Sequence, residues 1–287
     1  MKIGAFASIV TPICTPELIK DLGVSAESSG LDSLWLGEHV VLFDEMEVGY
    51  PGTPDGKLPI PEGSGLPDTV VTFSFLASVT KTIRFGTGVS LIPQRNLIYS
   101  ANEFATLDYL SNGRFDLGVG VGWCKEELVA CGFDFTTRGS RCDEMLEAMI
   151  RLWTEREVTY HGEHINLESV IMDPKPVQQP HIPLLIGGYS EAAMQRTARF
   201  GQGWIGFGAD AKQTAGALQQ LDRALKRENR SRNDLDIVVM PPSVDLNNVN
   251  EYQDIGVDRL IPMITASSTE SVKRRVDEIS LLIDKVS

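Results

Sequence analysis

Short apolar, β-branched runs alternate with amphipathic segments along the whole chain, and this alternation constrains the fold more than any other feature. The runs predict strands near Ile3–Val10, Ser33–Gly37, Ile83–Leu91, Phe115–Gly120, Leu184–Gly187, Trp204–Gly208, Ile237–Pro241 and Arg259–Ile264. The intervening segments predict helices over Pro16–Ser29, Thr69–Thr80, Leu97–Leu110, Cys142–Trp153, Glu191–Phe200, Ala211–Arg227, Asn248–Ile255 and Thr269–Val286. Strands that are each followed by a helix favour an α/β protein with a closed (β/α)8 TIM barrel. A doubly wound open sheet is the alternative that the same alternation allows.

The length of the chain suits one large domain. At 287 residues, of which 42% are hydrophobic, it can bury a full barrel core, which typically takes about 250 residues. We therefore expect a single domain over residues 1–287. Two stretches interrupt the alternation and predict insertions after strands two and four. Phe43–Pro67, rich in proline and glycine, predicts a long loop that forms a lid or a pocket wall, and Thr154–Pro183 predicts a short hairpin before the fifth strand.

The charge of the chain excludes some classes of partner. It has 26 basic and 39 acidic residues, a formal net charge of −13, and no block of lysine or arginine. Nucleic acid and anionic membranes are therefore not expected partners. No apolar run approaches the roughly 20 residues that cross a bilayer, and the N-terminal residues do not resemble a secretory signal, so we expect a cytoplasmic protein.

Neither the cysteines nor the histidines form a metal-binding pattern. The cysteines lack the paired short spacing of a zinc site and are expected to be reduced: Cys14, Cys124, Cys131 and Cys142. His161 and His164 have a suitable spacing, but they fall in the predicted hairpin and lack a third ligand. We expect no bound metal.

The residues that follow the strands are the candidates for chemistry, because TIM-barrel active sites lie at the carboxyl ends of the strands. Glu38 and His39 follow the second strand. A histidine can exchange a proton near neutral pH, and a neighbouring carboxylate can orient its ring. We expect His39 and Glu38 to be catalytic; a structural histidine at a strand end is the alternative.

Glycines gather after the third and fourth strands. Gly86 and Gly88 in the third strand allow the backbone to approach a flat ligand, or form an ordinary bulge at a barrel corner. The fourth strand ends in Gly118, Gly120 and Gly122, whose spacing resembles a dinucleotide fingerprint only superficially. These alternating glycines instead indicate a wall without side chains, against which a ring system can lie.

The fifth strand runs into Gly187, Gly188, Tyr189 and Ser190, directly before a predicted helix. The amides of a glycine-rich turn and the positive end of a helix favour binding of an anion such as a phosphate. A simple strand-to-helix turn is the alternative interpretation.

Several segments together resemble the luciferase-like monooxygenase family, the family of bacterial luciferase, and within it the branch that depends on the deazaflavin coenzyme F420. They are SLWLGEHVV, RFGTGVSLIPQRN, ATLDYLSNGRFDLGVGVGWCKEEL, RGSRCDE with Arg138, Asp143 and Glu144, and PLLIGGYSEAAMQRTARFGQGWIGFG. They run from Ser33 to Gly208 in the order of the family.

The resemblance implies a cofactor at the mouth of the barrel. Its ring is expected against Gly88, Val89, Gly120 and Gly122, with a cis peptide between Gly88 and Val89. Its phosphate is expected on the Gly187–Ser190 turn, and the Glu38–His39 pair near the reactive face of the ring.

One residue departs from the sugar-phosphate dehydrogenases of the family. A glutamate follows their strand-four glycines, whereas Trp123 stands at that position here. We therefore do not assign the proton donor or the substrate of those dehydrogenases to this chain. We expect Trp123 and Arg95 to line the substrate pocket.

The function that this resemblance implies is hydride transfer between reduced coenzyme F420 and a small organic substrate, with the chemistry supplied by the cofactor. An FMN-dependent monooxygenase that uses O2 and a separate flavin reductase is one alternative. A flavin-binding protein without turnover is another. The resemblance also implies a homodimer that packs the helices near strands two and three.

Overall fold

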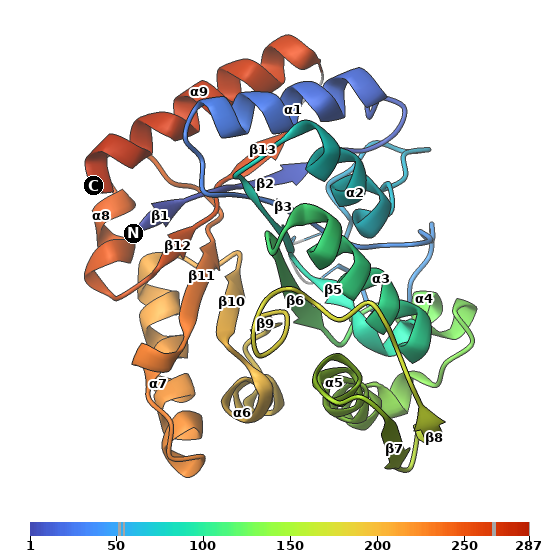
Figure 1. Ribbon diagram of the computed structural model, residues 1–287. Helices are drawn as coiled ribbons and strands as arrows, with labels where there is room; N and C mark the ends of the chain where they lie inside the picture. Colours follow the sequence, from blue (N-terminus) through green and yellow to red (C-terminus); the bar gives the residue numbers. More distant parts are fainter. Residues whose placement is uncertain (51–52, 54, 266–267, 287) are drawn as a thin grey trace.

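The strands lie close to their predicted positions and differ from them mainly at their ends. The structure is a computed structural model that describes residues 1–50, 53, 55–265 and 268–286. The main sheet (Figure 1) contains β1 (Lys2–Ile3), β2 (Ala5–Ser8), β3 (Ser33–Leu36), β4 (Arg84–Thr87), β5 (Ser90–Leu91), β6 (Phe115–Gly120), β9 (Leu184–Gly187), β10 (Gly203–Phe207), β11 (Asp236–Met240), β12 (Arg259–Leu260) and β13 (Met263–Thr265).

The sheet is parallel and closes on itself. β1 pairs with β12, while β2 pairs with β13 on one side and with β3 on the other. Only Gly4 separates β1 from β2, so the two form one barrel strand that lies between the last strand and the second. A Cβ atom on Gly4 would lie 2.7 Å from the backbone oxygen of Ser33, which explains why this crossing point needs glycine. The closed order confirms the TIM barrel and excludes the doubly wound open sheet.

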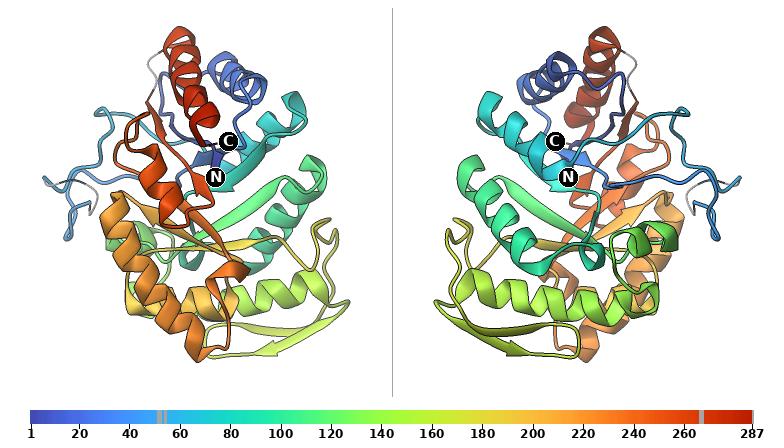
Figure 2. Two further views of the ribbon diagram at one scale, coloured as in Figure 1. Left: turned by 90° about the vertical axis from the view of Figure 1, so that its left-hand side faces the viewer. Right: turned by 90° about the vertical axis from the view of Figure 1, so that its right-hand side faces the viewer.

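The helices surround the sheet (Figure 2). They are α1 (Pro16–Ser28), α2 (Thr69–Val79), α3 (Leu97–Ser111), α4 (Lys125–Ala130), α5 (Arg138–Thr154), α6 (Glu191–Phe200), α7 (Ala211–Arg227), α8 (Val249–Asp254) and α9 (Thr269–Val286), with short 3-10 turns at Ile92–Gln94, Phe135–Thr137 and Arg232–Asp234. Side chains cap several of their first turns: Asn96 accepts the first free N–H groups of α3, and Asp210 forms a capping box with Gln213 at α7. The sequence pattern missed α4 and placed the start of α5 at Cys142 rather than Arg138.

Both predicted insertions are present. The long loop after β3 stands out from the body of the barrel in both views of Figure 2. Thr11 fixes one part of it, because the N–H of Gly65 donates to the Thr11 hydroxyl at 3.0 Å. The hairpin before β9 consists of β7 (Val158–His161) and β8 (Asn166–Val170), which pair antiparallel. Glu144 of α5 holds its turn by accepting the N–H groups of Glu163, His164 and Ile165.

The apolar core has two layers. One fills the barrel interior with large side chains from facing strands, including Phe6, Trp35 and Met240. The other lies between the sheet and the helices and is more extensive. No helix in the described residues is long and apolar enough to span a membrane.

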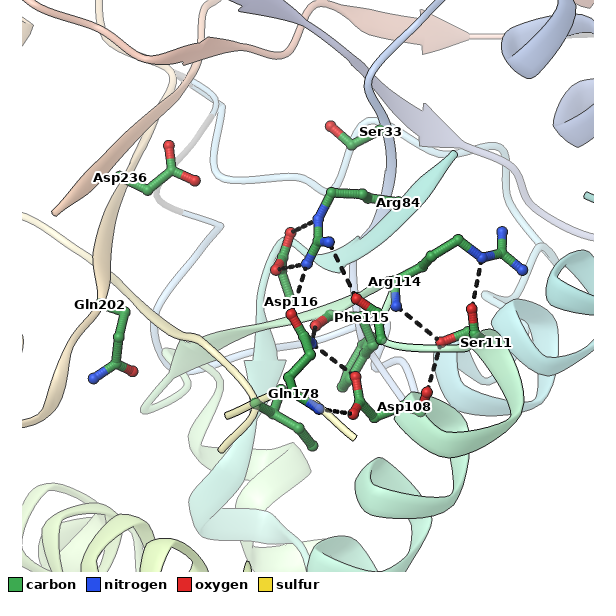
Figure 3. Close-up of polar contacts among 12 residues, drawn as sticks. Ser33, Arg84, Asp108, Ser111, Arg114, Phe115, Asp116, Gln178, Gln202 and Asp236 are labelled. Atoms are coloured by element: carbon green, nitrogen blue, oxygen red, sulfur yellow. Dashed lines mark hydrogen bonds and ion pairs between the residues drawn. The ribbon is translucent and has the colours of Figure 1, made fainter. Parts of the chain in front are cut away.

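The amino end of the barrel is closed by a buried ionic cluster (Figure 3). Asp116, fully buried at the start of β6, accepts hydrogen bonds from Arg84 of β4 and, at 2.7 Å, from Arg259 of β12. Burial alone would raise the pKa of Asp116, but the guanidinium groups of Arg259 and Arg84 hold it below its ordinary value. Gln178 extends the network by accepting from Arg84 and donating to Asp108. This cluster lies opposite the catalytic end of a TIM barrel and stabilises the fold.

Candidate active site at the carboxyl end of the barrel

His39 follows β3 and faces a carboxylate from a distant part of the chain. Its Nδ1 lies 2.7 Å from Oε2 of Glu127, which belongs to α4, the short helix after β6. The other oxygen of Glu127 accepts the backbone N–H of Val40 at 2.7 Å and the side-chain amide of Gln94 at 3.1 Å. The Glu127 side chain is 1% exposed, whereas that of His39 keeps 14% of its surface exposed. The site therefore contains a partly accessible imidazole that is anchored by a buried carboxylate.

Glu38 does not orient His39, contrary to the expectation from their adjacency. Its carboxylate accepts hydrogen bonds from the Ser90 hydroxyl at 2.7 Å, the Leu91 N–H at 3.2 Å and Arg95 at 2.7 Å. Burial raises the pKa of Glu38, although Arg95 and the two other donors oppose the shift. Neighbouring side chains in extended backbone project in opposite directions, and here Glu38 faces β5 while His39 faces α4.

Arg95, predicted to line the substrate pocket, is held by partners within the protein. Besides its bond to Glu38, its guanidinium pairs with Glu103 at 2.9 Å and donates to the Ser100 hydroxyl at 3.1 Å. Its cationic group is thus committed to two carboxylates of the protein. Arg95 connects the start of α3 to the segment after β3, and its charge is already neutralised.

Trp123 forms an aromatic wall beside His39. The two rings meet edge to face, with centroids 5.7 Å apart. Tyr50 of the long loop also packs against Trp123, with ring centroids 5.4 Å apart. The loop is attached to α4 as well, because the N–H of Glu47 donates to Glu126 at 2.7 Å. The described part of the loop therefore contributes to the surroundings of His39, and its role as a lid or pocket wall stays a prediction. Its residues 51, 52 and 54 lie outside the described residues.

Glycines at the ends of neighbouring strands make room for the segment after β4. The peptide bond between Gly88 and Val89 is cis, as the resemblance implies. The Val89 side chain fills the space above Gly120 and Gly187. A Cβ added to Gly120 would lie 2.4 Å from Val89, and one added to Gly187 would lie 2.8 Å from it. Gly88 and Val89 themselves remain partly exposed. Val89, just after β4, thus packs over the glycines at the ends of β6 and β9, at the mouth of the barrel.

Gly122 allows the chain to turn at the end of β6. Its φ of +81° lies in the left-handed region that favours glycine, and it turns the chain out of β6 toward α4. An added Cβ would have room there, because the nearest atom, in Leu128, is 3.8 Å away. The backbone conformation is therefore what requires this glycine.

The turn after β9 is a strand-to-helix connection, in which the N–H of Gly188 donates to the backbone oxygen of Ile205 at 3.4 Å. Gly188 adopts a φ of +118°, and the Ser190 hydroxyl caps α6 by accepting the Ala193 N–H at 3.2 Å. Tyr189 points back to the barrel, where its hydroxyl donates to the Phe207 oxygen at 3.0 Å. The turn and the first turn of α6 thus offer backbone N–H groups to an anion.

Arg138 supplies a positive charge at the start of α5. Its guanidinium stacks on the Phe135 ring at 3.7 Å, and its buried Nε finds no hydrogen-bond partner among the described residues. The next residue, Gly139, accepts a hydrogen bond from Arg196 of α6, so the first turn of α5 lies next to the helix that follows the glycine turn. Buried donors are normally paired, which makes Arg138 a candidate contact for a bound anion.

The histidines of the hairpin lie away from any cluster of ligands. His164 is 2.8 Å from the Ser140 hydroxyl, and His161 faces Glu168 at 3.7 Å. Across the described ranges, no group of three or more histidine, cysteine or acidic side chains is placed to hold a metal ion.

Sequence reasoning missed Glu127, Gln94 and Tyr50. Glu127 lies in a helix of six residues, which is too short to show the helical period that identified the other helices. The signal present was acidic residues in a potential first helical turn, at Glu126 and Glu127. Which of them faces His39 depends on how β3 and β6 are placed around the barrel.

Comparison with known proteins identifies the family. The family model described as "Luciferase-like monooxygenase" matches residues 1–248. An uncharacterised protein of Mycobacterium tuberculosis (strain ATCC 25618 / H37Rv) is 38% identical over 181 residues, which cover 63% of this chain and 64% of that protein. The F420-dependent glucose-6-phosphate dehydrogenase of Kineococcus radiotolerans is 30% identical over 209 residues, 71% of this chain and 56% of that enzyme. This chain thus spans less than two thirds of the length of these two relatives.

Solved structures share the fold. An F420-dependent secondary alcohol dehydrogenase, in complex with an F420–acetone adduct, superimposes with a TM-score of 0.80, covering 100% of this chain and 99% of that one, at 16% sequence identity. The agreement supports the barrel topology independently of sequence identity. Together with the family match over most of the chain, it shows that this protein belongs to the luciferase-like monooxygenase family.

Proposed function

We propose that this protein is an oxidoreductase that transfers a hydride between coenzyme F420 and a small, uncharged organic substrate. The observation that carries the proposal is the arrangement at the barrel mouth, where the partly exposed Gly88 and Val89 lie over Gly120 and Gly187. The dehydrogenase of Kineococcus radiotolerans, a relative at 30% identity, supports F420 as the cofactor.

The residues at the mouth fit a flat ring that carries a phosphate tail. Side chains at Gly120 or Gly187 would collide with Val89 and disrupt the surface on which a ring can rest. The amides around Gly188 and the unpaired Nε of Arg138 suit a phosphate. Bound F420 supplies the hydride chemistry, and the protein supplies binding, orientation and proton handling.

His39 is proposed to exchange the proton that accompanies hydride transfer. Its side chain is partly accessible, and Trp123 covers one side of the ring. Neutral imidazole and imidazolium interconvert near neutral pH, so a histidine at this position can act as general acid or base. Trp123 and Tyr50 pack against each other beside the His39 ring.

The lining of the mouth favours a substrate without charge. Phe207 at the end of β10, Met263 at the start of β13 and Val89 are partly buried apolar side chains that pack on the barrel interior. Arg95, the basic residue nearest to Glu38, is neutralised by its own carboxylate partners. A free cation favours binding of a phosphorylated substrate, whereas an apolar alcohol or ketone gains nothing from one.

Titration of the purified protein with F420 and, separately, with FMN tests the cofactor assignment. We expect saturable quenching of F420 fluorescence and no saturable change with FMN. A substrate panel with reduced F420 follows, which compares apolar ketones with sugar phosphates. Preferred turnover of a sugar phosphate would contradict the uncharged substrate class.

The family description supports a second candidate, an FMN-dependent monooxygenase that uses O2 and receives reduced FMN from a separate reductase. The same ring surface and phosphate turn would serve FMN. Saturable binding of FMN without binding of F420 would support this candidate and overturn the first. A binding protein without turnover would hold the cofactor with its mouth closed, and the partial exposure of His39 argues for access.

A further inference from the structure

Glu127 is a buried carboxylate whose partners are all hydrogen-bond donors from the region around His39. It is 1% exposed and contacts Nδ1 of His39, the N–H of Val40 and the amide of Gln94. In the part of the chain that the structure describes, no lysine or arginine forms an ion pair with Glu127. A buried carboxylate needs donors, so its position depends on these contacts.

The contacts determine where the proton of a neutral His39 ring lies. An ionised carboxylate only accepts hydrogen bonds, so Nδ1, at 2.7 Å from Oε2, must carry the hydrogen. Nε2 is then the nitrogen that lacks a hydrogen and can accept a proton. Within the described residues, no hydrogen-bond partner of Nε2 is found.

We propose that Glu127 is the positioning residue of His39, which holds the ring in the Nδ1–H form and leaves Nε2 available for proton exchange. The inference rests on the proposed function only in assigning proton exchange to His39. It assigns to Glu127, from helix α4 after β6, the role that adjacency in sequence suggests for Glu38. A carboxylate that fixes the tautomer of a catalytic histidine is a general device in enzymes.

Glu127→Gln tests this assignment with a specific prediction. The N–H of Val40 and the amide of Gln94 both donate to Oε1, so they select the oxygen of the glutamine amide at that position. The NH2 group then takes the place of Oε2 and faces Nδ1 of His39. A ring that accepts at Nδ1 carries its hydrogen on Nε2, so the substitution is expected to switch the tautomer.

The readout is 15N NMR of the histidine rings in the protein without cofactor, at about pH 9, where an ordinary imidazole is neutral. The His39 signal is assigned by its absence from His39→Asn. We expect the Nδ1–H form in the wild type, the Nε2–H form in Glu127→Gln, and the wild-type form in Glu126→Gln, the neighbouring control on α4, which contacts Glu47 instead. An Nε2–H ring in the wild type overturns the proposal, and this measurement remains decisive if Glu127→Gln fails to fold.

Turnover supplies the second readout. Glu127→Gln is expected to lower kcat by roughly 10²-fold or more with unchanged cofactor affinity, since the wrong nitrogen then carries the hydrogen. A switched tautomer with kcat within about three-fold of wild type would overturn the positioning role. Failure of F420 to bind would instead refute the proposed cofactor, and the NMR result would still decide the state of the ring.

Discussion

At the scale of single residues, adjacency in the sequence and contact in the structure point to different partners for His39. Glu38 is its neighbour along the chain, but Glu38 binds Ser90, Leu91 and Arg95, whereas His39 is held by Glu127, 88 residues away. The residue types at the strand ends could therefore be predicted, and the pairing between them could not. Pairing depends on which loops meet above the barrel.

His39→Asn is expected to separate binding from chemistry. Asparagine keeps polarity and approximate shape but cannot titrate, so cofactor affinity should change little while turnover falls by roughly 10²-fold. Steady-state kinetics and fluorescence titration measure the two effects. His164→Asn, in the exposed hairpin, is the control and should leave both unchanged. Turnover within a few-fold of wild type would make His39 a structural residue.

Gly188→Ala is expected to weaken cofactor binding by more than tenfold. The φ of +118° disfavours any side chain, and the new Cβ would lie 3.2 Å from that of Ala193, which displaces the amides of the turn. Gly256→Ala is the matched control. Gly256, in the loop before β12, also has a positive φ of +85°, but a Cβ added there would have no atom within 4 Å. Equal affinity for F420 in both variants would remove the phosphate from this turn.

At the scale of elements, the connections between helices and strands depend on local capping that the sequence only partly shows. Asn96, Ser190 and Asp210 precede helices as N-caps, and the corresponding boundaries of α3, α6 and α7 match those predicted. Glu27 is different. It lies in the last turn of α1 and accepts the N–H groups of Lys81, Thr82 and Ile83, which lead into β4.

This contact predicts a dependence of stability on pH. Partial burial would raise the pKa of Glu27, but the three N–H groups and the Thr82 hydroxyl lower it from 4.5 to about 2. The folded protein therefore holds the charged form more strongly than the unfolded chain does. The stabilisation is fully present above about pH 5 and is lost as the pH falls toward 2.

Urea unfolding of Glu27→Gln measures how much the charged Glu27 contributes to the free energy of unfolding. At pH 7 we expect the free energy of unfolding to fall by about 1–3 kcal/mol, the usual cost of removing a charged hydrogen-bond acceptor. The difference from wild type should shrink as the pH is lowered from 5 to 3. Glu157→Gln, at an exposed position before β7, serves as the control with little change expected. A difference that does not depend on pH would show that the charge of Glu27 is unimportant.

At the scale of the whole molecule, the two ends of the barrel differ in their chemistry. The amino end is closed by the cluster around Asp116 (Figure 3), and the carboxyl end presents glycines, aromatic rings and His39. The outer face also has an apolar region on α2 and α3, where Val71, Phe75, Tyr99 and Leu110 are exposed. Exposed apolar patches of this kind mark surfaces that associate.

We expect α2 and α3 to form the interface of the homodimer that the family resemblance implies. Val71 and Tyr99 are about 70% exposed in the first turns of these neighbouring helices. The double substitution Val71→Glu and Tyr99→Glu should shift the mass measured by light scattering from dimer to monomer, because it buries like charges in the interface. Leu281→Glu, at an exposed position of α9, should leave the mass unchanged. A wild-type monomer, or a dimer that tolerates the double substitution, would contradict this interface.

The sequence by itself determined the barrel and the order of its main strands and helices, because these depend on local periodicity. It also indicated turns that need glycine, because few other residues tolerate their backbone conformations. Closure of the barrel was inferred from repetition of the strand–helix unit and is confirmed by the pairing of β1 with β12 and of β2 with β13. Tertiary structure alone decided the partners at the mouth. Glu127 reaches His39 across non-adjacent barrel strands, and Arg95 turns to Glu38 from the neighbouring strand, because these loops converge at the mouth. Side-chain direction above the strands depends on barrel curvature and on short helices such as α4, and neither leaves a periodic signal in the sequence.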